Sequence, residues 1–419
     1  MDKIIVEGGQ PLAGEVWVSG AKNAALPLMA TSILCGGRLS LENVPDLKDL
    51  ATMGRLLEHM GGQVEMGNGR AGLDMSSLNM PEAPYELVKT MRASALVLGP
   101  LLARCGKARV SLPGGCAIGA RPIDLHLKAL ELMGAVIDLD GGYVVARAPE
   151  GGLRGAHIHF DIVTVTGTEN LMMAAALAKG RTIITGAARE PEVADTARAL
   201  QAMGARISGV FTDELVIDGV DELKPATYRV MPDRIEAGTL IAAAGLAGGR
   251  ILLHGVPHEA LDPVYDKIRE AGIELEIQGD DLTVASSGSI KSVNITTRPH
   301  PGFPTDMQAQ FMALMTIGDQ TSIITETIFE NRFMHVSELL RLGADIALEG
   351  RTAVIKGVHR LSGAPMMATD LRASASLILA ALAAKGQSEI SRVYHLDRGY
   401  DRLDDKLITL GARIKRIKT

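Results

Sequence analysis

The sequence has 419 residues and a formal net charge of -6, and 47% of its residues are hydrophobic although only 3% are aromatic. This length suits two or three domains, whose interior must be filled by aliphatic side chains and 19 Met. An acidic chain lacks the basic face that nucleic-acid binding needs, although a local arginine cluster can still hold small anions.

Nothing in the sequence predicts export or membrane insertion. Residues 1–20 hold charges and glycines without an apolar run, and stretches such as 171–178 are too short to cross a bilayer. Cys35, Cys105 and Cys116 form no CxxC pair, which favours a reduced setting without disulfides. We therefore expect a cytoplasmic protein that binds neither nucleic acid nor membrane.

A short motif recurs six times along the chain: an apolar residue, then Gly, then a small or apolar residue. Its glycines lie about 70 residues apart, at Gly61, Gly134, Gly204, Gly272, Gly343 and Gly411. A period this long is unlike the usual solenoid repeats. It predicts a small α/β unit that is copied six times.

Each of these glycines ends an amphipathic helical pattern and precedes a strand-like run. The clearest helical patterns cover Leu47–Met60, Pro122–Met133, Glu192–Met203 and Arg402–Leu410. Glycine after the last helical residue explains why each helix stops there, because it adopts the left-handed conformation without steric cost.

A second type of helix precedes each amphipathic one and is apolar almost all round, which predicts burial on every side. These helices are expected at Ala24–Cys35, Ala93–Cys105, Leu171–Lys179, Ala237–Ala247, Met307–Ile317 and Ala373–Lys385. Each begins beside polar residues, namely Lys22 and Asn23, Thr90 and Arg92, Thr168 and Glu169, Asp233, Thr305 and Asp306, or Thr369 and Asp370. N-capping explains the Thr and Asp residues. Six helix N-termini also gather partial positive charge, so the architecture predicts an anion site.

The six units divide as three plus three, with a join near residues 228–233. We expect an α/β fold of two similar lobes, with a cleft between them that holds ligands.

The segment 111–122 holds three glycines and two prolines, which predicts a loop around Cys116. Arg121 is near in the sequence, and a thiol beside a cation has a lowered pKa and gains reactivity. A plain surface thiol explains the position equally well. Cys35 and Cys105 end apolar helices and are expected in the core.

Several cations stand where units meet, at Lys22, Arg92, Arg332, Arg372 and Arg398. Any one of these arginines could pair structurally with a neighbour such as Asp370 or Asp397. For the set together a shared anionic ligand is the better explanation, because guanidinium groups match carboxylate and phosphate. Taken alone, Asp306 is explained as an ordinary first-turn carboxylate.

The sequence contains neither GxGxxG nor GxxxxGK[ST], so it predicts no dinucleotide site and no Walker loop. His157 and His159 could share one face of a strand, but two ligands do not make a metal site. We expect neither metal nor cofactor.

Seven segments together resemble the enolpyruvyl transferase family, and within it the members that act on UDP-N-acetylglucosamine. They are residues 19–24, 112–122, 187–191, 303–310, 330–335, 370–375 and 397–400, and the resemblance spans the whole chain. It implies the family's two-domain inside-out α/β barrel, with six βαβαββ-like units, three per domain, around buried helices. The implied lobes are residues 22–229, and residues 1–21 together with 230–419.

The resemblance implies transfer of the enolpyruvyl group of phosphoenolpyruvate to the 3′-hydroxyl of UDP-N-acetylglucosamine, with release of phosphate. In such members this is the first committed step of peptidoglycan precursor synthesis. Transfer to shikimate 3-phosphate is the alternative, against which the Leu-Pro-Gly-Gly-Cys loop argues. A catalytically silent repeat protein that binds UDP-sugars is a further alternative, and we expect a monomer or a weak homo-oligomer.

The resemblance also implies roles for single residues. Cys116 matches the acid that protonates phosphoenolpyruvate and reacts with fosfomycin, and Asp306 matches the base that deprotonates the sugar hydroxyl. The implied contacts to phosphoenolpyruvate are Lys22, Arg92, Arg121, Arg332, Arg372 and Arg398. The implied contacts to UDP-N-acetylglucosamine are Asn23, Arg92, Arg121, Pro122, Ile123, Asp124, Leu125, Asp306 and Ile328. Ile162 stands where many members have Lys, which leaves nucleotide contacts in residues 162–170 open.

Overall fold

The computed structural model describes residues 2–89, 91–112 and 123–418, apart from the side chain of Arg92. The described residues form two compact units: one comprises residues 2–19 and 232–418, and the other lies within residues 20–231. Each unit has its own core of buried aliphatic and Met side chains.

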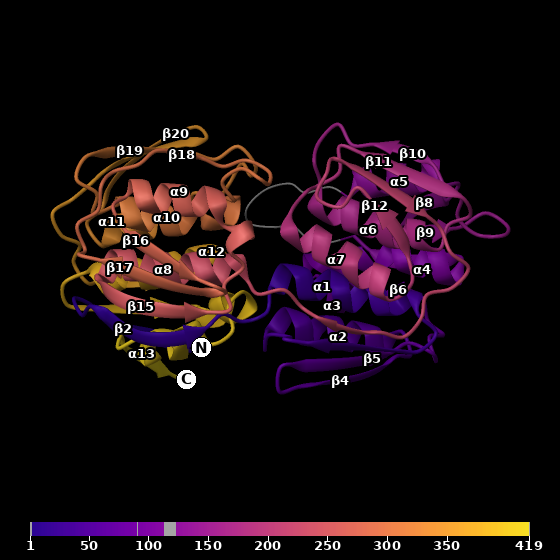
Figure 1. The fold of residues 1–419 in the computed structure, drawn as a ribbon, viewed down its shortest axis with the longest axis horizontal. Helices are drawn as coiled ribbons and strands as arrows, with labels where there is room; N and C mark the ends of the chain where they lie inside the picture. Colours follow the sequence, from indigo (N-terminus) through magenta and orange to yellow (C-terminus); the bar gives the residue numbers. More distant parts are fainter. Residues whose placement is uncertain (1, 90, 113–122, 419) are drawn as a thin grey trace. The chain divides into compact units, whose positions relative to one another are not determined.

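Six four-stranded sheets of one design make up the described chain, three in each unit (Figure 1). In every sheet one outer strand pairs parallel with its neighbour, and the other pairs are antiparallel. In the unit of residues 20–231 the orders are β14 (Thr227–Arg229), β3 (Arg38–Glu42), β5 (Arg70–Asp74), β4 (Gln63–Gly67); β6 (Glu82–Ala83), β7 (Lys107–Ser111), β9 (Tyr143–Arg147), β8 (Val136–Asp140); and β10 (His157–His159), β11 (Arg181–Thr185), β13 (Glu214–Asp218), β12 (Arg206–Ser208). In the other unit they are β16 (Glu274–Gln278), β17 (Asp281–Ser286), β15 (Gly249–His254), β2 (Leu12–Trp17); β18 (Ile295–Thr296), β19 (Thr321–Thr325), β21 (Thr352–Lys356), β20 (Asp345–Glu349); and β22 (Pro365–Met367), β23 (Gln387–Ser391), β1 (Lys3–Glu7), β24 (Arg413–Ile417). The predicted α/β fold with six copies of one small repeat, three in each of the two compact units, is confirmed.

The N-terminal strands complete sheets of the unit that holds residues 232–418. Strand β1 lies between β23 and β24 and pairs antiparallel with both. Strand β2 pairs parallel with β15 along its whole length, from Leu12 beside Gly249 to Trp17 beside His254. In β1 the side chains of Ile4 and Val6 are buried and their neighbours are not, as expected for a strand with one face on the core.

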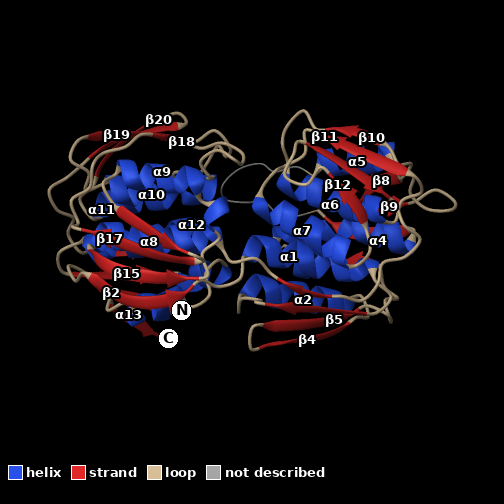
Figure 2. Ribbon diagram, viewed as in Figure 1, coloured by secondary structure: helices blue, strands red, loops and turns tan. Residues whose placement is uncertain are grey.

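Six apolar helical segments lie in the middle of the units, and the strands lie around them (Figure 2). They are α1 (Lys22–Thr31) continued by η1 (Ser32–Leu34), η2 (Arg92–Val97) continued by α4 (Leu98–Cys105), α6 (Val165–Ala176), α8 (Arg234–Ala247), η4 (Thr305–Met307) continued by α10 (Gln308–Met315), and α12 (Leu371–Ala383). Every residue of α10 is buried, as are nearly all of α8 and α12. The prediction of helices without an exposed face is therefore confirmed.

Six amphipathic helices cover these segments, and the prediction that glycine ends each of them is also confirmed. They are α2 (Lys48–His59), α5 (Asp124–Leu132), α7 (Pro191–Ala202), α9 (Asp262–Glu270), α11 (Val336–Arg341) and α13 (Leu403–Thr409). The glycine that follows each one has a φ between 85° and 106°. These are left-handed values, at which a side chain would be strained. The remaining short helices are α3 (Tyr85–Val88), η3 (His258–Ala260) and η5 (Val393–Arg398).

The helix starts agree only in part with the predicted N-caps. Asp233 and Asp370 do cap α8 and α12, since each carboxylate accepts hydrogen bonds from two backbone N–H groups. At α6 the prediction was wrong, because the helix begins six residues earlier and is capped by Thr164. Thr168 and Glu169 consequently lie inside α6, where the Thr168 hydroxyl donates to the carbonyl of Thr164 at 2.8 Å. None of the helices in the described ranges is long and apolar enough to cross a membrane.

Candidate active site

The predicted base lies where three distant segments of the chain meet. Asp306 belongs to η4, directly before α10, while Arg332 comes from the loop after β19 and Arg372 from the first turn of α12. Arg332 Nη2 donates to Asp306 Oδ1 at 2.6 Å. Arg372 donates to Asp306 Oδ2 from Nε at 3.2 Å and from Nη2 at 3.1 Å. Three residues of the predicted set thus form one cluster, which we call the Asp306 clamp.

Burial makes the Asp306 clamp electrostatically strong. The side chains of Arg332 and Arg372 are only 6% and 3% exposed, whereas that of Asp306 is 25% exposed. Burial by itself raises the pKa of Asp306, but the charges of Arg372 and Arg332 outweigh it and hold the pKa of the carboxyl far below its usual range. Burial lowers the pKa of Arg372, and the Asp306 charge reverses this and raises it. Without ligand, the carboxylate is therefore anionic at any physiological pH.

A polar network holds Arg372 from behind. Its Nη1 donates to the carbonyl of Gly399 at 3.4 Å, and its guanidinium carbon lies 5.1 Å from the ring centroid of Tyr400. The buried Tyr400 hydroxyl lies 3.0 Å from Thr239 Oγ1 and accepts from Gln310 Nε2 at 3.0 Å. Side chains from α8, α10 and the segment after η5 thus fix the orientation of the guanidinium group.

Arg332 has a support of its own. Its Nη1 donates to Thr305 Oγ1 at 2.9 Å, and the Thr305 hydroxyl donates to Glu326 Oε2 at 2.8 Å. The guanidinium carbon also lies 5.2 Å from the ring centroid of Phe329. Neither Glu326 nor Tyr400 was predicted as a site residue, since a single acidic residue after a strand and a single Tyr have no local signature.

The other predicted residues of this unit are next to groups that contact or support the clamp. Arg398 is half-buried and ends η5, one residue before the carbonyl that binds Arg372. The backbone N–H of Ile328 donates to Glu326 Oε1 at 2.8 Å. Asp397 accepts from Arg416 Nη2 at 2.7 Å through both oxygens. Asp397 is next to Arg398 in the sequence, and its carboxylate forms an ion pair with Arg416.

The unit within residues 20–231 holds a second cationic position. Lys22 is the first residue of α1, and its Nζ lies 2.7 Å from Asp49 Oδ2 in the first turn of α2, both side chains being almost completely buried. Asn23 is exposed beside it. Lys22 thus already has one carboxylate partner.

The remaining predicted positions of this unit are only partly described. Ile123 is buried, and Asp124 and Leu125 form the first turn of α5. Arg92 begins η2. Cys116, Arg121 and Pro122 lie outside the described residues, as does Thr90. Within the described ranges, no group of three or more His, Cys, Asp or Glu is placed to hold a metal ion.

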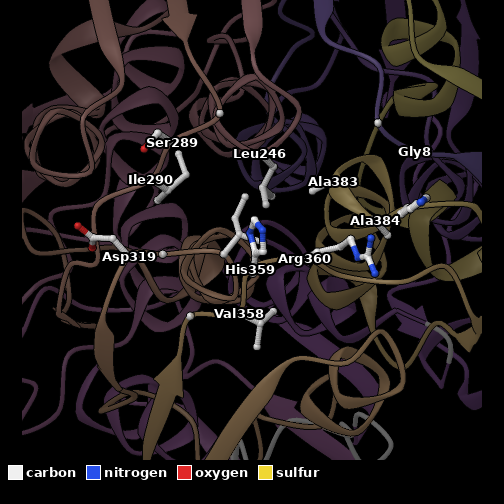
Figure 3. A pocket seen from close by; sticks show the side chains of 16 residues that line it. Gly8, Leu246, Ser289, Ile290, Asp319, Val358, His359, Arg360, Ala383 and Ala384 are labelled. Carbon is white, nitrogen blue, oxygen red and sulfur yellow. The ribbon is translucent and has the colours of Figure 1, made fainter.

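A hollow of about 850 Å³ lies at the C-terminal ends of the buried helices α8 and α12, whereas Arg372 of the Asp306 clamp is in the first turn of α12 (Figure 3). Leu246 near the end of α8 and Ala383 at the end of α12 line it, together with the exposed Arg360 and Lys385. Because α12 has 13 residues and therefore spans about 20 Å, this hollow is far from the Asp306 clamp. Basic side chains are generally favoured near helix C-termini, and none of the predicted site residues lines the hollow.

Comparison with known proteins identifies the family. A family model described as EPSP synthase (3-phosphoshikimate 1-carboxyvinyltransferase) matches residues 6–407. The chain belongs to this family of enolpyruvyl transferases. Relatives from Geobacter metallireducens and Myxococcus xanthus, both named UDP-N-acetylglucosamine 1-carboxyvinyltransferase, are 60% and 58% identical to it over the full length of both chains.

Solved structures of enolpyruvyl transferases share the fold. The enolpyruvyl transferase NikO from Streptomyces tendae covers the whole chain with a TM-score of 0.90 at 25% identity, and 99% of the NikO chain is matched. An EPSP synthase from Acinetobacter baumannii matches over 100% of both chains with a TM-score of 0.76 at 18% identity. The inside-out barrel expected from the sequence is thereby confirmed as the fold of this enolpyruvyl transferase.

Proposed function

We propose that the chain transfers the enolpyruvyl group of phosphoenolpyruvate to the 3′-hydroxyl of UDP-N-acetylglucosamine and releases phosphate. The observation that carries this proposal is the full-length identity of 57–60% to relatives named for that reaction. The geometry of the described residues supports it. The Asp306 carboxylate can accept a proton, and the two buried arginines that contact it can bind anionic substrate groups.

In this mechanism Asp306 takes the proton of the sugar 3′-hydroxyl. Cys116 gives a proton to C3 of phosphoenolpyruvate, which leaves C2 electron-poor, and the sugar oxygen forms a bond to C2. The C2–O bond to phosphate then breaks, C3 loses a proton, and the carbon–carbon double bond returns in the product. One proton thus enters C3 and one leaves it, so the step balances without an oxidant or reductant.

The arginines have two tasks in this scheme. Arg332 and Arg372, together with Arg398, Arg121, Arg92 and Lys22, offset the charge of the phosphoenolpyruvate anion and of the departing phosphate. While they hold that anion, Arg332 and Arg372 also share their charge with it, so they hold the Asp306 carboxylate less strongly. Because the two arginines are what keeps the pKa of Asp306 low, an arriving anion makes this carboxylate a better base.

The acceptor would contact a second set of residues, which shares Arg92 and Arg121 with the phosphoenolpyruvate set. Asn23, Arg92, the segment 121–125, Asp306 and Ile328 would contact the UDP-sugar, as the resemblance implies. The exposed side chain of Ile162 offers no charge to a nucleotide phosphate where many members have Lys. A cytoplasmic monomer or weak homo-oligomer belongs to the same proposal.

Phosphate release decides between the two acceptors. Purified enzyme is mixed with phosphoenolpyruvate and either UDP-N-acetylglucosamine, shikimate 3-phosphate or no acceptor, and inorganic phosphate is measured. We expect release only with the UDP-sugar and loss of this release after fosfomycin treatment. Release with shikimate 3-phosphate would establish the alternative, and no release with either acceptor would leave a silent UDP-sugar-binding protein as the better explanation.

A further inference from the structure

A buried carboxylate outside the predicted site makes four hydrogen bonds. Glu326 is 1% exposed and follows β19 directly. Its Oε1 accepts from Thr297 Oγ1 at 2.9 Å and from the backbone N–H groups of Ile328 at 2.8 Å and Phe329 at 3.2 Å. Its Oε2 accepts from Thr305 Oγ1 at 2.8 Å. Such density of donors around one side chain indicates a fixed geometry.

Sheet topology explains why the donors meet there. Strands β18 and β19 run parallel, with Thr296 beside Thr325, so Thr297 and Glu326 both lie at the carboxyl ends of neighbouring strands. The backbone is held as well, because Thr327 N donates to Thr297 Oγ1 at 2.9 Å and Thr327 Oγ1 donates to the Thr297 carbonyl at 2.6 Å. The position of Glu326 is thus set by the sheet and not by a mobile loop.

The two carboxylate oxygens of Glu326 serve different parts of the candidate site. Oε1 fixes the backbone of residues 328 and 329, and Ile328 is a predicted contact to the UDP-sugar. Oε2 leads to the candidate base, because Thr305 Oγ1 accepts from Arg332 Nη1 and Arg332 Nη2 donates to Asp306. The buried Glu326 side chain therefore contacts both the segment predicted to bind the UDP-sugar, residues 328–329, and the chain of hydrogen bonds through Thr305 and Arg332 to Asp306.

The hydrogen bonds of Thr305 have a fixed direction. Its hydroxyl donates its single proton to Glu326 Oε2. Its oxygen lone pairs are then free to accept from Arg332, whose five N–H groups can only donate. An amide in place of the carboxylate would present an NH₂ group to Thr305 and remove the reason for this orientation.

We propose that Glu326 is a positioning residue that couples the acceptor-binding segment at Ile328 to the candidate base Asp306, through Thr305 and Arg332. This proposal rests on the proposed function. Glu326 touches neither the substrate nor the reacting atoms in this scheme; it fixes the residues that do. If Glu326 had only a structural role, its substitution would lower stability. It would not change kcat in one variant and the KM for the UDP-sugar in another.

The test uses phosphate release by the full-length enzyme with three single variants and one double variant. In Glu326→Gln the amide oxygen can stay on the three Oε1 donors while the NH₂ group faces Thr305. We therefore expect kcat to fall about tenfold and the KM for UDP-N-acetylglucosamine to stay within about twofold. Thr305→Val should lower kcat by a similar factor, and the Glu326→Gln/Thr305→Val double variant should lose little more than either single variant. Thr305→Ser, which keeps the hydroxyl, should retain wild-type kcat.

A fourth single variant tests the other arm. Glu326→Ala removes Oε1 as well and should raise the KM for the UDP-sugar at least tenfold. The matched control is Glu349→Gln, an exposed carboxylate on β20 of the same sheet, which should behave as wild type. Thermal unfolding of each variant separates loss of fold from loss of positioning, and Glu326→Gln keeps the test decisive if Glu326→Ala does not fold.

Three outcomes would overturn the proposal. They are wild-type kcat in Glu326→Gln, multiplicative losses in the double variant, and an unchanged KM in a folded Glu326→Ala enzyme. A wild-type enzyme that releases no phosphate with UDP-N-acetylglucosamine would instead refute the proposed function, and this coupling with it.

Discussion

Replacing Asp306 with Asn removes the charge from the Asp306 clamp and keeps its shape. Arg332 and Arg372, 6% and 3% exposed, would then lack the carboxylate that both now contact. Removing one partner of a buried ion pair costs about 3–5 kcal/mol, and the 25% exposure of Asp306 places the expected loss near the lower value. For a unit of this size about 3 kcal/mol corresponds to a fall in Tm of roughly 6–12 °C.

The same substitution removes the candidate base. Loss of a positioned base lowers turnover by roughly 10²–10⁴-fold, which is about 3–5 kcal/mol of transition-state stabilisation. We expect kcat for phosphate release to fall within this range, while the KM for phosphoenolpyruvate changes little or decreases. A decrease would follow because the two arginines no longer have a competing internal anion.

Steady-state phosphate release and calorimetric unfolding check both expectations on the same preparation. Asp345→Asn, an exposed residue on β20, is the matched control and should leave kcat and Tm unchanged. If Asp306→Asn lowered the Tm but turned over like wild type, Asp306 would be only the structural counter-ion of the two arginines.

Three further substitutions test other parts of the scheme. Cys116→Ser should lose most of the turnover and all alkylation by fosfomycin, which mass spectrometry detects; full activity would exclude the acid role. Tyr400→Phe removes the hydroxyl that Thr239 and Gln310 contact, while Gln310 Nε2 can still donate to Thr239 Oγ1, so we expect a loss of about 1 kcal/mol in denaturant unfolding and a reduced kcat; an unchanged enzyme would show that the network does not hold Arg372. Burial lowers the pKa of His335 to about 4, so between the ordinary value near 6.5 and about 4 the unfolded chain binds the proton and the folded chain does not. Stability should therefore fall by up to about 3 kcal/mol as pH drops through this window, and His335→Gln should flatten this part of a thermal-unfolding pH series; an identical slope in both proteins would contradict the assignment.

Local signals in the sequence were sufficient for the repeated architecture. The six glycines that follow the amphipathic helices, among them Gly61 and Gly411, have positive φ and act within one helix turn, so periodicity along the chain reveals them. The start of α6 was misplaced because Thr164 and Thr168 are equally suitable caps, and tertiary packing decides between them. Local preference therefore predicts that an element exists more securely than where it begins.

The candidate site depended on contacts that no local signal contains. Asp306 meets Arg332 and Arg372 across 26 and 66 residues, and only the resemblance to a family joined them before the structure did. Glu326 had no signature at all, because its importance follows from a sheet edge where two parallel strands end. Buried polar networks are specified by the completed fold, and their members are correspondingly hard to find from sequence.

The strength of the Asp306 clamp has a consequence for the order of events. A carboxylate whose pKa is held far below its usual range is a poor base, so the free enzyme should not be ready to deprotonate an alcohol. An anion that binds Arg332 and Arg372 removes part of that restraint, and the pKa of Asp306 should then rise. Carbon-13 NMR of labelled Asp side chains, assigned with Asp306→Asn, measures this titration with and without inorganic phosphate. If phosphate did not change the pKa of Asp306, anion binding at Arg332 and Arg372 would not control the base. The rise in basicity would then have to come from binding of the UDP-sugar alone.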